Sequence, residues 1–142
     1  MFVFYGINFW AVLVGALVAF VIGALWFGPK TFYPLWWKAL GKGPDEQPGS
    51  ANMPAVFALT FVGVFLAILG LAVAMEFANA AFGQMNWPSG VFLGALFGFL
   101  IGGGTSLSHR MFSGQGLKVW ILEIGNDVVA LAAAGAILAI WN

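Results

Sequence analysis

Polar side chains interrupt the last long apolar stretch of this sequence and share one side of the helix that it predicts. Glu123, Asn126 and Asp127 are spaced i, i+3 and i+4, a spacing that places them on one helical face. A charged side chain at the centre of a membrane costs about 2.5–3.5 kcal/mol on insertion scales. These residues are therefore candidates for binding a cation, relaying a proton, or pairing with another buried group.

The preceding apolar stretch supplies possible partners for them. Thr105, His109 and Arg110 occupy its last turns, and a tight antiparallel hairpin would bring them toward Glu123. In a structural interpretation, Arg110 or His109 pairs with Glu123, and the two other polar residues of that face form hydrogen bonds between helices. In a functional interpretation, the polar residues of both stretches line a hydrated pocket for a cation or a proton relay. A buried Asp127 without a cationic partner is expected to be protonated, which weakens the cation-site interpretation.

The residue sets that most enzymes and metal sites need do not occur here. The chain contains no cysteine and one histidine, and one histidine does not make a metal site by itself. No glycine loop joins a strand to a helix in the way that phosphate-binding loops do. We therefore expect no enzymatic activity, no metal site and no cofactor.

The composition indicates which medium surrounds these residues. Of 142 residues, 62% are hydrophobic and 7% are charged, whereas a water-soluble domain carries about a quarter charged residues. Five Lys and Arg balance five Asp and Glu, so the chain has no net positive charge to attract nucleic acid. We therefore expect the lipid bilayer to be the main partner of this chain.

Four apolar stretches are long enough for the roughly 20 residues that a membrane-crossing helix needs. They cover about residues 7–27, 54–80, 89–110 and 117–141. Candidate N-caps precede the second and third stretches: Ser50 and Asn52, and then Ser89. The first stretch lacks the basic start of a secretory signal, so we expect it to be retained. The sequence predicts an all-α bundle of four transmembrane helices, forming a single membrane domain over residues 1–142.

The connections between the spans indicate an orientation. Residues 31–41 are aromatic and basic, which predicts a short interfacial helix, and residues 41–53 are rich in Gly, Pro and charge, which predicts a flexible loop. All five basic residues lie in or beside the first and third connections: Lys30, Lys38, Lys42, Arg110 and Lys118. By the positive-inside rule, loops 28–53 and 111–116 are cytoplasmic and both termini are outside.

Tryptophans mark the inner ends of the spans. Trp26, Trp36, Trp37 and Trp120 fall at this level. Interfaces enrich tryptophan because its ring is apolar and its N–H is polar. We expect these four residues to be interfacial anchors.

Small residues recur every fourth position in two spans. One stripe is Ala11, Gly15, Ala19 and Gly23, and the other is Gly90, Gly94, Gly98 and Gly102. Because lipid provides no hydrophobic drive for helix association, small residues that permit close packing mark helix contacts, either inside the bundle or between subunits. Residues 15–23 and 94–102 are identical at six of nine positions, which fits either a duplicated hairpin or chance similarity of two apolar segments.

Several local motifs resemble a known family. They are Asn8-Phe9-Trp10-Ala11, residues 23–29 around Trp26-Phe27-Gly28-Pro29, Trp36-Trp37-Lys38 before Gly41-Lys42, and the final hairpin over 112–117 and 135–138. In these the chain resembles the small bacterial membrane proteins of domain-of-unknown-function family 1761. The resemblance implies a four-helix protein of the bacterial cytoplasmic (inner) membrane. It does not indicate an activity, and no functional residues can be carried over from the family.

Three functional hypotheses follow. The first is a structural or accessory subunit that packs through its glycine stripes against itself or another membrane protein. The second is an oligomeric transporter or channel for a small solute, cation or proton that uses the Glu123/Asp127 face. The third is a site for a lipid or a hydrophobic pigment among the aromatic residues.

Overall fold

The computed structural model describes residues 2–49 and 52–141, where every regular element is a helix. The predicted cap Ser50 lies outside these residues. The elements are η1 (Phe2–Tyr5, a 3-10 helix), α1 (Phe9–Trp26), α2 (Tyr33–Ala39), α3 (Met53–Phe82), α4 (Trp87–Leu96), η2 (Phe97–Gly103, a π-helix), α5 (Gly104–Phe112) and α6 (Gly116–Ile140). Helices α4, η2 and α5 follow one another directly and form a single span, Trp87–Phe112. The described residues thus contain four helices long and apolar enough to cross a membrane, which confirms the predicted all-helical architecture with four long apolar helices.

Asparagine side chains cap three of the four spans. Asn8, Asn52 and Asn86 each accept a hydrogen bond from a backbone N–H in the first turn of the helix that follows. The predicted cap Ser89 is wrong: its backbone N–H donates to Asn86 Oδ1 at 3.0 Å. The helix begins earlier because Pro88 fits the first turn, where no intrahelical N–H is needed.

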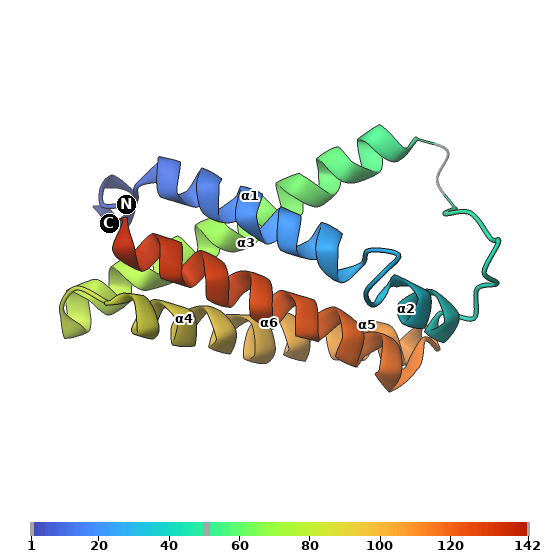
Figure 1. Ribbon diagram of the computed structural model, residues 1–142. Coiled ribbons are helices and arrows are strands. Elements are labelled where there is room, and N and C mark those ends of the chain that lie inside the picture. Colours follow the sequence, from blue (N-terminus) through green and yellow to red (C-terminus); the bar gives the residue numbers. More distant parts are fainter. Residues whose placement is uncertain (1, 50–51, 142) are drawn as a thin grey trace.

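The two ends of the bundle differ in charge. The chain termini lie close together at the same end as the α3–α4 connection (Figure 1), and Asn8 Nδ2 donates to the Trp141 carbonyl at 2.9 Å. Helix α2, the loop after it and the α5–α6 turn lie at the opposite end (Figure 1). The five basic residues all belong to this second end, as the predicted connections require.

Helix α6 is the centre of the bundle. It contacts α1, α2, α3, α4, η2 and α5, and its buried residues Ala134 and Leu138 pack in one cluster with Val12 of α1 and Leu71 of α3. The N-terminal half of α3 diverges from the other helices (Figure 1). Most of its residues from 54 to 67 are therefore exposed.

The π-helix η2 changes the register of the third span. A π-turn advances five residues where an α-turn advances four. Among the glycines of η2, those in the tightest contact with α6 are therefore Gly98 and Gly103, whereas a Cβ on Gly102 would be only in ordinary contact with α6, at 3.7 Å. Three consecutive glycines, 102–104, weaken the preference for a regular α-helix here. At the end of the π-turn, Thr105 Oγ1 donates to the Ile101 carbonyl at 2.7 Å.

The two similar segments have different backbones. Residues 15–23 lie wholly in the regular helix α1, whereas residues 94–102 extend into the π-helix. The sequence similarity is thus not matched by equal helical geometry. Duplication of a hairpin stays a prediction.

Candidate functional site

An ion pair joins the last two helices at the basic end of the bundle. Arg110 Nε lies 2.6 Å from Glu123 Oε2, and the two side chains are 34% and 16% exposed. The Arg110 guanidinium also donates through Nη1 to Gln115 Oε1 at 2.5 Å. Of the two partners considered for Glu123, Arg110 is the one in contact. The pair stabilises the α5–α6 hairpin, because loss of either partner would leave the other charge partly buried and unpaired.

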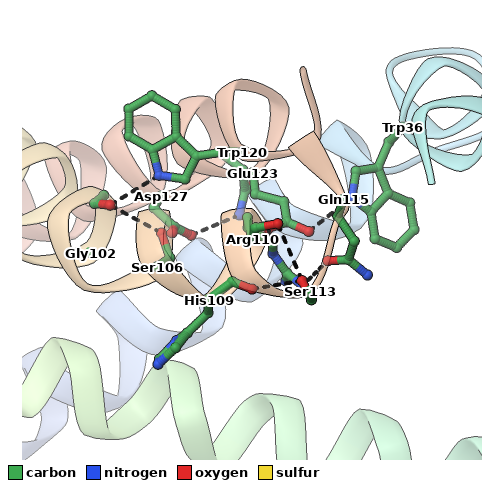
Figure 2. Close-up of polar contacts among 12 residues, drawn as sticks. Trp36, Gly102, Ser106, His109, Arg110, Ser113, Gln115, Trp120, Glu123 and Asp127 are labelled. Atoms are coloured by element: carbon green, nitrogen blue, oxygen red, sulfur yellow. Dashed lines mark hydrogen bonds and ion pairs between the residues drawn. The ribbon is translucent and has the colours of Figure 1, made fainter. Parts of the chain in front are cut away.

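The second carboxylate oxygen of Glu123 binds helix α2. Trp36 Nε1 donates to Glu123 Oε1 at 3.0 Å, so that both oxygens of this carboxylate have partners (Figure 2). Glu123 therefore connects three elements: α2, α5 and α6. Nothing in the spacing of the sequence indicates the contact between Trp36 and Glu123, which are 87 residues apart.

The other predicted tryptophan anchors also donate hydrogen bonds within the chain. Trp26 Nε1 donates to the Leu122 carbonyl at 2.9 Å and Trp120 Nε1 to the Gly103 carbonyl at 3.0 Å. Trp37 Nε1 donates to a loop carbonyl, that of Gly43, at 2.9 Å. These indoles connect helices and loops in addition to any place they have at a membrane interface.

A second polar pair lies deeper along α6. Asn126 Nδ2 is 3.5 Å from Asp127 Oδ1, and Asn126 Oδ1 is buried with no hydrogen-bond partner among the described residues. The amide lies opposite Gly23 of α1, where a Cβ would stand 3.8 Å from Asn126 Oδ1. A Cβ on Gly102 would stand 3.7 Å from Asp127 Oδ2. The pair therefore fills the space that these glycines leave between α1, η2 and α6.

Thr105 and His109 do not join this polar group. Both are exposed, and the His109 ring points away from the Arg110–Glu123 pair (Figure 2). The structural reason is the π-turn, which rotates the end of the span by about one residue. Thr105 and His109 thus lie apart from the two polar pairs, and the predicted pocket that includes them stays a prediction.

The predicted stripe in the third span packs against α6. A Cβ on Gly90 or Gly94 would overlap the Gly135 or Leu131 carbonyl, and one on Gly98 would come within 2.8 Å of Val128 Cα. Because these are backbone atoms, only glycine permits this approach. Gly102, the last predicted member, packs less closely on α6 than its neighbour Gly103 does.

The stripe in the first span is also internal. Ala11 and Ala19 are buried, as is Gly15, whose Cβ would stand 3.2 Å from Ile68 of α3 and 3.5 Å from Ala134 of α6. Gly23 faces the polar pair, as described above. Both stripes therefore serve contacts inside the bundle.

These groups provide an ionic connection and a buried polar pair. Within residues 2–49 and 52–141, no group of three or more His, Cys, Asp or Glu could hold a metal ion.

Comparison with curated proteins and with solved structures gave no significant match. The sequence model of one family matches residues 10–139, nearly the whole chain. With its four apolar helices and the motifs noted above, the chain belongs to the family described as protein of unknown function (DUF1761).

Proposed function

We propose that this protein is a structural or accessory membrane subunit that packs against a second copy or another membrane protein. The surface that supports this proposal is on α3. Both predicted stripes are occupied inside the bundle, so they leave no small-residue surface for a partner. A third row of small residues, on α3, is exposed.

This α3 row consists of Gly63, Ala67 and Gly70. The three residues are exposed, and a Cβ added to either glycine would meet nothing within 4 Å. Their spacing of i, i+4 and i+7 places them on one face of the helix. A second helix could approach closely here, which is how small residues stabilise helix association in lipid.

The α3 row leads toward an apolar groove. It continues at four-residue steps through Ala74 to Ala78, and Ala78 lines an open groove of about 480 Å³ with Phe82 of α3 and Phe92 and Leu93 of α4. The row and the groove together offer a partner helix a contact surface along much of α3. The sequence alone does not distinguish this row, because small residues are spaced more regularly in the first and third spans.

Cross-linking in native membranes tests the proposal. We expect wild-type protein to give a cross-linked dimer or complex, and Gly63→Ile/Gly70→Ile to lose most of it, because the added side chains hold the partner helix away. Ala58→Ile is the matched control: Ala58 is exposed on α3 and, at about 100° per residue, lies far around the helix from the row. Absence of any cross-linked species in wild type, or unchanged cross-linking in the double variant, would overturn the proposal.

A second candidate function is transport of a cation or proton by an oligomer. It is supported by the buried Asn126 Oδ1, which has no partner among the described residues, and by the π-helix beside Asp127, since π-turns are frequent at functional sites. Asp127→Asn should abolish flux in proteoliposomes, whereas Asp45→Asn, in the loop, should not. Equal flux in wild type and Asp127→Asn would exclude this function.

A further inference from the structure

The basic end of the bundle carries cations that the protein itself does not neutralise. Arg110 pairs with Glu123, and Lys42 lies 3.7 Å from Glu46. Lys30, Lys38 and Lys118 are exposed and form no ion pair among the described residues. These three lysines, named here the lysine group, belong to the α1–α2 turn, to α2 and to the first turn of α6.

Helix α2 is held firmly where these charges lie. Trp36 donates to Glu123, and Trp37 is buried, donates to the Gly43 carbonyl and stacks on Tyr33 with ring centroids 5.4 Å apart. These contacts attach one side of α2 to α6 and to its own loop.

The other side of α2 has no such contacts with the residues that the structure describes. It exposes Leu35 and, three residues later, Lys38. Residues three apart lie on the same face of a helix, so an apolar side chain stands beside a cation. This is the arrangement of a helix that lies in a membrane interface.

We propose that the lysine group and the exposed face of α2 bind the headgroups of anionic phospholipids. The charge pattern selects this partner: every Lys and Arg of the chain is at this end, and anionic headgroups attract basic residues that lie beside a membrane span. Leu35 enters the acyl boundary while Lys38 meets the phosphate layer. Because Trp36 joins α2 to Glu123, bound lipid stabilises the ion pair of the α5–α6 hairpin as well as α2.

Lipid titration of the full-length protein in a neutral detergent tests this inference. Phosphatidylglycerol and phosphatidylcholine are added separately, and bound lipid is counted by native mass spectrometry. We expect preferential binding of phosphatidylglycerol by wild type, and a loss of about fivefold in affinity for each lysine removed in Lys30→Gln/Lys38→Gln/Lys118→Gln. Lys42→Gln/Glu46→Gln is the matched control, because it removes both members of the exposed pair and leaves the net charge unchanged, and it should bind like wild type.

Three results would overturn the inference. They are equal binding of both lipids by wild type, preserved phosphatidylglycerol binding in the triple variant, and an equal loss in Lys42→Gln/Glu46→Gln. Thermal unfolding in lipid-free detergent provides the check on folding. Because all three lysines are exposed, their replacement should leave the unfolding temperature unchanged. Added phosphatidylglycerol should then raise the unfolding temperature of wild type and not that of the triple variant.

Discussion

Gly98 and Gly103 face the same helix although five residues separate them. Gly98 packs on the backbone of α6 at Asp127 and Val128, and Gly103 packs on Ile124 and Trp120 one turn earlier in α6. Only the π-turn between them makes this possible, because in a regular α-helix the residue above Gly98 would be Gly102.

Alanine substitution at the two neighbouring glycines tests this register. A Cβ on Gly103 would come within 2.8 Å of Ile124 Cδ1, whereas the nearest atom to one on Gly102 is 3.7 Å away. Gly103→Ala should therefore lower the free energy of unfolding by about 1–2 kcal/mol, and Gly102→Ala should be neutral or stabilising by up to about 1 kcal/mol. Thermal unfolding in detergent measures both. The reverse order would indicate a regular α-helix.

The Arg110–Glu123 pair should show energetic coupling. Arg110→Gln or Glu123→Gln alone leaves a partly buried charge without its partner, which should cost about 1–3 kcal/mol. The double variant should cost less than the two single variants combined. The exposed pair Lys42–Glu46 is the control, because exposed pairs contribute about 0–1 kcal/mol. Additive effects at Arg110 and Glu123 would contradict a direct interaction.

Trp36→Phe should loosen α2 without unfolding the bundle. The variant keeps the ring but removes the N–H that donates to Glu123, and a hydrogen bond to a charged group contributes about 1.5–3 kcal/mol. Hydrogen exchange of residues 33–39 should therefore rise about tenfold. Trp10→Phe, at an exposed position near the opposite end of the bundle, should leave this exchange unchanged. Equal exchange in wild type and Trp36→Phe would mean that other contacts hold α2.

Reporter fusions should establish on which side of the membrane each end of the bundle lies. Residues 45 and 114 lie at one end of the bundle and residue 84 at the other (Figure 1). We propose that the first two are cytoplasmic, in a bacterial inner membrane, because all basic residues share their end. Alkaline phosphatase should thus be active when fused after residue 84 and inactive after 45 or 114. Activity at only one of residues 45 and 114 would contradict four spans.

The four long apolar helices could be predicted from the sequence alone. Apolar length and the positions of Gly, Pro and Asn decide where a helix can cross a membrane and where it begins and ends, and these are local properties. Each predicted end accordingly lies within about two residues of the corresponding helix end. The segment 31–41, predicted to be an interfacial helix, contains the helix α2. The basic residues fall at one end because two long helices, α3 and the helix Trp87–Phe112, separate the first connection from the third.

Which side chains meet depends on how the helices pack against one another, and no local pattern gives this. Thr105 and His109 are displaced from the acids by a π-turn whose cause is distributed over a glycine-rich segment and its packing on α6. Trp36 reaches Glu123 across 87 positions, a contact that no periodicity encodes. Periodicity identifies rows of small residues in a helix, but which row faces a neighbour depends on the relative rotation of the packed helices. In the structure, both predicted stripes face other helices of the bundle, whereas Gly63 and Gly70 are exposed.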